Sequence, residues 1–162
     1  MKNDDGMTVI GLVVTGLVIL ILAILVLNVA FGESGLILRK KKAEVIKYTE
    51  NIEKEIEKKA YEMQEESKEI PDEDRHNHYM AEMQSYINSM VENNNKEKKK
   101  KIDIHMTKEK PQGEIGKTLV NENISDNIIY VEIKNRDYIS LIEIVVANNQ
   151  IGITKTNTYR IK

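Results

Sequence analysis

The order of hydrophobic and polar positions begins with a long uncharged run. No residue is charged from residue 6 to residue 32. This run exceeds the roughly 20 helical residues that cross a bilayer, so residues 7–31 are predicted to form a transmembrane helix. A secretory signal peptide has a shorter apolar core followed by a small-residue cleavage site, and neither is present here. The run therefore predicts a retained membrane anchor.

In the next part of the chain, apolar residues recur at every third or fourth position, which indicates two amphipathic helices. The first is expected over residues 36–67. The second is expected over residues 72–92, after Pro71 and an acidic first turn that favours a helix N-terminus. We expect them to pack as a hairpin, and a coiled coil with another chain is the alternative for the first. The two stripes are Val45, Thr49, Ile52, Ile56, Ala60 and Met63, and Tyr79, Met80, Met83, Ile87, Met90 and Val91.

The period then changes to the two-residue alternation of strands. Strands are expected at residues 101–106, 128–134, 138–147, 150–154 and 158–161, with turns at residues 135–137 and 148–149. A small antiparallel meander cannot cover its own apolar face, so the upstream helices are expected to cover it. The predicted fold class is α+β. An N-terminal transmembrane helix extends into an amphipathic helix, which packs with a second helix on a C-terminal antiparallel sheet.

The N-terminal segment also has a distinctive order of residues. A glycine precedes the uncharged helix, and a glycine-bounded turn separates that helix from a charged one. These features are carried by Gly6-Met7-Thr8-Val9-Ile10-Gly11 and Gly32-Glu33-Ser34-Gly35-Leu36-Ile37. Through these two segments, residues 1–45 resemble the N-terminus of type IV pilin-like proteins, a group that includes the pseudopilins of type II secretion. The likeness is to the form of this N-terminus found in low-GC Gram-positive anaerobes.

The resemblance implies that a prepilin peptidase cuts between Gly6 and Met7 and methylates the new N-terminus at Met7. Residues 1–6 would be a leader peptide, 7–31 the transmembrane helix, 32–95 a helical stalk and hairpin, and 96–162 an antiparallel β domain. Most pilins place Glu at the fifth mature position, where this chain has Gly11. The departure favours a minor structural or assembly component of a type IV pilus or a type II secretion-like filament.

The same resemblance implies partners and a location. The expected partners are other pilin-like subunits, the prepilin peptidase, the membrane assembly platform and the lipid bilayer. The expected location is the cytoplasmic membrane, crossed once, with the C-terminal domain outside the cell or in a cell-surface filament.

Small residues gather on one face of the predicted membrane helix when it is drawn at about 100° per residue. In lipid such residues let helix backbones approach closely, which predicts a helix-packing face. The alternative is that Gly and Thr are simply frequent in membrane helices. The residues of this face are Thr8, Gly11, Thr15, Gly16, Ala23 and Ala30.

The basic residues favour the opposite orientation. Only Lys2 precedes the apolar run, whereas Arg39, Lys40, Lys41, Lys42 and Lys47 follow it, and the positive-inside rule would place the C-terminal domain in the cytoplasm. The alternative function is therefore a single-pass membrane adaptor with a cytoplasmic helix-plus-sheet interaction domain. In that orientation the basic residues could also contact anionic lipid.

Little in the rest of the sequence indicates chemistry. The net charge is −2 and cysteine is absent, which excludes thiolate metal sites, and no catalytic motif is present, so we expect no enzyme and no cofactor. His76 and His78 are two apart on a helix and point about 200° from each other, so no metal site is expected. The lysine-rich linker over residues 93–101 lacks aromatic residues that stack on bases, and no nucleic acid is expected. Gly116-Lys117-Thr118 has Pro111 where a phosphate-binding loop needs glycine, and is expected to be a loop or short strand.

Overall fold

A computed structural model describes residues 5–32, 35–96, 101–109, 111, 127–147 and 149–161. The chain divides into two compact units, Met1–Lys40 and Lys41–Lys162. The first contains α1 (Asp5–Phe31), and the second contains most of α2 (Leu36–Glu66) together with the rest of the fold. Gly116-Lys117-Thr118, expected to be a loop or short strand, lie outside the described residues.

Two glycines end α1 and begin α2. The Gly32 amide donates to the Asn28 carbonyl at 2.8 Å, and the Gly35 amide donates to the Gly32 carbonyl at 2.8 Å. A Cβ atom at Gly32 would clash with the Asn28 carbonyl oxygen, and one at Gly35 would lie 2.6 Å from the Ala30 carbonyl oxygen. Side chains are therefore excluded at both positions, which confirms the predicted break between the apolar and charged helices.

The predicted helical hairpin is confirmed. After α2, the 3₁₀ helix η1 (Ser67–Glu69) and Pro71 lead into α3 (Asp72–Lys96), where the Pro71 carbonyl accepts from the amides of Asp74 and Arg75. The Lys59 ammonium contacts the Glu82 carboxylate at 2.6 Å and so joins α2 to α3. The buried residues of the two helices include the predicted stripes from Val45 to Met63 and from Tyr79 to Ile87, together with Leu38 and Asn94, whereas Met90 and Val91 of the second stripe are only half-buried.

The end predicted for the second helix was wrong by four residues. The polar run after residue 92 was expected to begin a linker, but α3 continues to Lys96. Asn94 is buried because its side chain accepts from the Tyr48 hydroxyl at 2.6 Å and donates to the Ile102 carbonyl at 3.1 Å. These bonds to distant segments hold the last turn of α3 in place.

The five predicted strands form one antiparallel sheet. They are β1 (Asp103–Thr107), β2 (Ile128–Lys134), β3 (Tyr138–Ala147), β4 (Gln150–Lys155) and β5 (Tyr159–Arg160). The order is β1-β2-β3-β4, and β5 also pairs with β3. The turn between β2 and β3 forms because the Asn135 side-chain oxygen accepts from the amides of Asp137 and Tyr138, at 2.9 and 2.8 Å.

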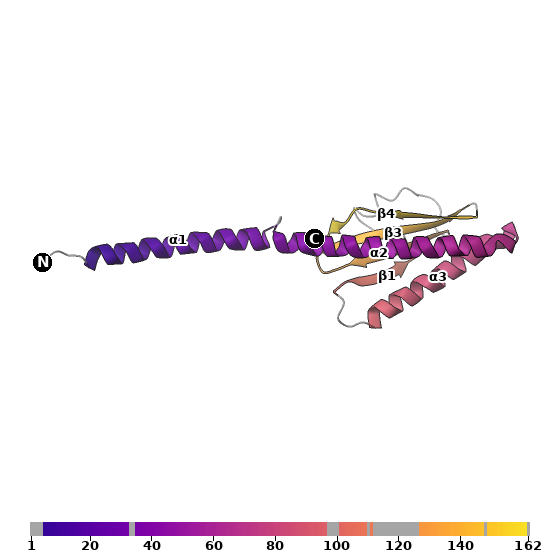
Figure 1. Ribbon diagram of the computed structural model, residues 1–162, viewed down its shortest axis with the longest axis horizontal. Helices are drawn as coiled ribbons and strands as arrows, with labels where there is room; N and C mark the ends of the chain where they lie inside the picture. The colour runs from indigo at the N-terminus through magenta and orange to yellow at the C-terminus, as the bar shows by residue number, and fades with distance from the viewer. Residues whose placement is uncertain are drawn as a thin grey trace. The chain divides into compact units, whose positions relative to one another are not determined.

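Both faces of the central strands are buried. Ile104, Ile133 and Ile144 lie on the face that α2 and α3 cover, and in Figure 1 the two helices run along the sheet. On the other face, Ile128, Tyr130 and Leu141 form a second buried cluster. The sequence predicted one covered face, and the second cluster explains why β2 and β3 are apolar at almost every position.

Candidate functional site

Helix α1 is the candidate membrane-spanning element of the described residues. By length and composition, it holds the one apolar stretch within the described residues that could cross a membrane. Its large apolar side chains are exposed, as at Leu12, which is 76% exposed, and Leu27, which is 56% exposed. A helix that is apolar on every side, with its large side chains exposed, is typical of a membrane span. This agrees with a single-pass anchor.

The predicted helix-packing face lies on this helix. Gly11, Thr15, Gly16 and Ala23 are exposed and Ala30 is half-buried. The Thr15 hydroxyl donates to the Gly11 carbonyl at 2.8 Å, so its hydrogen bond is satisfied within the helix. No described atom comes within 4 Å of a Cβ atom placed on Gly11 or Gly16, which leaves room for a neighbouring backbone.

The predicted processing residues lie at the start of α1. Gly6, Met7 and Thr8 belong to its first turns, and their side chains are outside the described part of the chain. Their predicted roles, cleavage between Gly6 and Met7, methylation of Met7 and helix packing by Thr8, therefore remain predictions.

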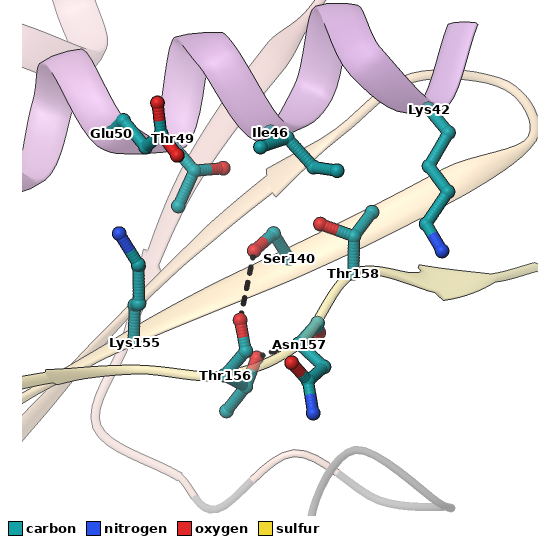
Figure 2. Close-up of a pocket in the computed structure, with 9 residues that line it drawn as sticks. All are labelled: Lys42, Ile46, Thr49, Glu50, Ser140, Lys155, Thr156, Asn157 and Thr158. Carbon is teal, nitrogen blue, oxygen red and sulfur yellow. Dashed lines mark hydrogen bonds between the residues drawn. The ribbon is translucent and has the colours of Figure 1, made fainter. Parts of the chain in front are cut away.

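A hollow of about 250 Å³ lies between α2 and the outer edge of the sheet (Figure 2). It exists because β4 ends at Lys155 and β5 resumes the pairing with β3 at Tyr159. The connecting residues bulge from the edge, and the Thr156 amide is held by the Leu141 carbonyl at 2.8 Å. The lining residues are Lys42, Ile46, Thr49 and Glu50 from α2, Ser140 from β3, and Lys155, Thr156, Asn157 and Thr158 from the edge.

Several polar groups of this hollow are bonded within the chain. The Thr49 hydroxyl donates to the Val45 carbonyl at 2.8 Å, and the Ser140 hydroxyl donates to the Thr156 carbonyl at 3.5 Å. The Lys155 ammonium lies 2.6 Å from the Glu53 carboxylate, whose hydrogen bond raises the pKa of Lys155. These three side chains are therefore engaged within the chain, and none of the described lining residues forms a nucleophile and base pair.

A second hollow of about 390 Å³ separates α2, α3 and the start of the sheet. Ile52, Met90 and Ile104 supply apolar walls, and Tyr48 and Tyr86 lie at its sides. Burial, followed by the charges of Glu55 and Glu62, raises the pKa of Tyr86. Polar residues also line this hollow, among them Asn51, Glu55, Ser89 and Asn93, so it is a surface depression of mixed polar and apolar character.

His76 and His78, for which no metal site was expected, lie on α3. His78 Nε2 lies 3.1 Å from one oxygen of Glu82, and the other oxygen of Glu82 bonds Lys59 and raises the pKa of that lysine. No group of three or more His, Cys, Asp or Glu side chains is placed to hold a metal ion within the described residues. The sequence did not reveal that Glu82 links both helices, because this link depends on a partner 23 positions away.

Comparison with known proteins gives no relative, so the function of this chain has to be inferred from the structural features described above. No family model, curated protein or solved structure matches this chain.

Proposed function

We propose that this protein is a pilin-like, membrane-anchored structural or assembly component of a type IV pilus or a type II secretion-like filament. The observation that carries the proposal is α1, a helix that is uncharged from Gly6 to Phe31, has exposed apolar side chains and ends at a break where only glycine fits. It is followed by a charged helix that packs on an antiparallel sheet, which is the order that the resemblance at residues 1–45 implies.

The proposed subunit is held in the bilayer by α1 and meets other pilin-like subunits through the small-residue face. Small side chains allow close backbone contact in lipid, where no hydrophobic drive brings helices together. The internal bond of Thr15 supports this use, because the hydroxyl brings no unsatisfied polar group to a helix interface. Glycine instead of glutamate at residue 11 assigns the subunit a minor role rather than that of the main filament protein.

The proposal is tested at the N-terminus of the protein recovered from membranes. In cells with an active prepilin peptidase, we expect mass spectrometry to find a chain that begins at Met7 and carries one added methyl group. The Gly6→Val variant should keep Met1 and residues 2–6, because the residue before the cut is changed. The same substitution at Gly16 is the matched control and should leave processing intact. An unprocessed wild-type chain in such cells would contradict the proposal.

A second candidate function follows from the basic residues after α1. Arg39 and Lys40 are exposed on the first turns of α2, and Lys42 follows them, which is the charge pattern that the positive-inside rule associates with a cytoplasmic segment. In this alternative the chain is a single-pass adaptor that displays the α2, α3 and sheet unit to a cytoplasmic protein partner. The membrane orientation separates the two functions.

A further inference from the structure

Hydrogen bonds bring separate segments of the unit Lys41–Lys162 to one end. The Asn135 side-chain amide donates to the Lys41 carbonyl at 3.0 Å, and the Lys41 ammonium contacts the Asp137 carboxylate at 2.6 Å. The Ile161 amide donates to the Asp137 carbonyl at 2.8 Å. The start of this unit, the turn between β2 and β3, and the end of the described chain therefore lie together.

The end of α3 and the start of β1 reach the same place. Asp103, the first residue of β1, pairs with Lys134, the residue directly before the β2–β3 turn. The Asn94 side chain donates to the Ile102 carbonyl at 3.1 Å, which holds the last turn of α3 beside the start of β1. In Figure 1, α3 ends and β1 begins on the side of the sheet where α2 starts.

This end, which we call the basic end, carries an excess of positive charge. Its acidic neighbours among the described residues include Glu44, Glu92, Asp103 and Asp137, of which Asp137 is paired with Lys41. Lys96 contacts Glu92 only at 3.9 Å, with both side chains exposed. The basic residues of the basic end are Lys41, Lys42, Lys96, Lys101, Arg136 and Arg160.

The opposite end of the same unit is acidic. Where α2 passes through η1 into α3, the two basic residues Lys68 and Arg75 are paired with Glu65 and Asp72. The charge of the unit is thus separated along α2. The acidic residues of this opposite end are Glu62, Glu65, Glu66, Glu69, Asp72, Glu73 and Asp74.

The basic end is also the end that the chain tethers to α1. Only residues 32–40 separate Phe31 from Lys41, and nine extended residues span at most about 30 Å. If α1 crosses a bilayer, the basic end is confined near the surface of that bilayer and the acidic end can move away from it. Anionic head groups attract the basic end and repel the acidic end.

We propose that the basic end docks on the anionic phospholipid head groups of the membrane that α1 crosses. The proposal rests on membrane anchoring by α1, and it holds for either orientation of the chain. Lys42, Lys101 and Arg136 are exposed and reach the docking surface from α2, the start of β1 and the β2–β3 turn. Each basic residue close to an anionic surface is expected to change the docking equilibrium about fivefold.

The test uses the full chain in lipid nanodiscs with a fluorescent probe on one introduced cysteine, since the natural chain has none. Asn95→Cys places the probe at the basic end and Glu73→Cys places it at the acidic end, both at exposed positions. The discs contain phosphatidylcholine alone or an equal mixture with phosphatidylglycerol, and a small share of lipid carries a quencher on its head group. We expect strong quenching at residue 95 in mixed discs only, reversed by high salt, and little quenching at residue 73.

Charge variants assign the effect to the basic end. The combined variant Lys42→Gln, Lys101→Gln and Arg136→Gln should lower the docked-to-undocked ratio roughly a hundredfold, to the level of phosphatidylcholine discs. The matched control Lys54→Gln, Lys58→Gln and Lys68→Gln removes the same charge from exposed sites elsewhere and should dock like the natural chain. Circular dichroism of each variant checks the fold, and the salt effect on the natural chain tests docking without any variant.

Three results would overturn this proposal. The first is equal quenching at residue 95 in both lipid mixtures. The second is quenching that appears only in discs with several copies of the chain, since the basic end would then meet the acidic end of another copy. The third is failure of the chain to copurify with the discs, which would show that α1 does not anchor the chain in a bilayer. The processing of the N-terminus is read in a separate experiment, so a failure of docking by a chain that stays in the discs leaves the filament proposal standing, whereas loss of the anchor contradicts both proposals.

Discussion

Asn94 illustrates how a single polar side chain can decide where a helix ends. It lies in a run of three asparagines that sequence patterns assign to a linker, yet its side chain is only 6% exposed. One amide group bonds both Tyr48 on α2 and the Ile102 carbonyl before β1. A buried amide is tolerated because it is paired on both sides.

Replacing this side chain should destabilise the fold. Asn94→Ala leaves the Ile102 carbonyl and the Tyr48 hydroxyl without these partners, and the free energy of unfolding should fall by about 1–3 kcal/mol. Urea unfolding in detergent, followed by circular dichroism, measures the change. The neighbouring Asn93→Ala, at an exposed position, should change the unfolding free energy by less than about 0.5 kcal/mol. Equal effects of the two substitutions would contradict the role given to Asn94.

At the scale of elements, α2 is the helix that organises the second unit. One face packs on the sheet and α3, and its remaining surface is charged and solvated. Charged pairs on such a surface contribute little, so the helix depends on its narrow apolar stripe. Two isoleucines on this helix differ in the environment of their side chains. Ile56 is fully buried, and Ile46 is 37% exposed beside the first hollow.

This difference predicts that replacing isoleucine by alanine lowers the free energy of unfolding more at residue 56 than at residue 46. Ile56→Ala should lower the free energy of unfolding by about 2–5 kcal/mol, because it removes buried methyl groups and leaves a cavity. Ile46→Ala should cost about 1 kcal/mol, because its side chain is already partly solvated. Both variants change helix propensity equally, so the comparison of urea midpoints isolates packing. A larger effect at Ile46 would mean that the stripe does not pack as described.

Elements with a strong local signal were predicted well from the sequence. The bounds of β2 follow from alternation, those of β3 from its run of Ile, Val and Leu, and the turn between them from Asn135. The break before α2 follows from Gly32 and Gly35. The true end of α3 and the hollow beside β4 could not be predicted, since they arise from bonds between residues far apart in sequence. The roles of Gly6 and Met7 are not visible in the fold and need the processing experiment.

At the scale of the whole molecule, two properties of the chain predict opposite orientations. The resemblance of residues 1–45 implies that the unit Lys41–Lys162 is outside the cell. The basic residues after α1 would retain it in the cytoplasm. Docking on anionic lipid is compatible with both, because the charge of the basic end acts on whichever surface it faces. Orientation therefore has to be measured on the intact chain in cells.

Single introduced cysteines measure the membrane orientation directly, because the natural chain has no cysteine that would also react with the label. Glu57→Cys places a thiol on an exposed site of α2. If the chain is a pilin-like subunit, a membrane-impermeant maleimide should label this thiol in intact cells as fully as after lysis. Lys2→Cys, combined with Gly6→Val so that the leader stays attached, should be labelled only after lysis. Protection of Glu57→Cys in intact cells would place the folded unit in the cytoplasm and favour the adaptor, because a filament subunit cannot assemble outside from that side.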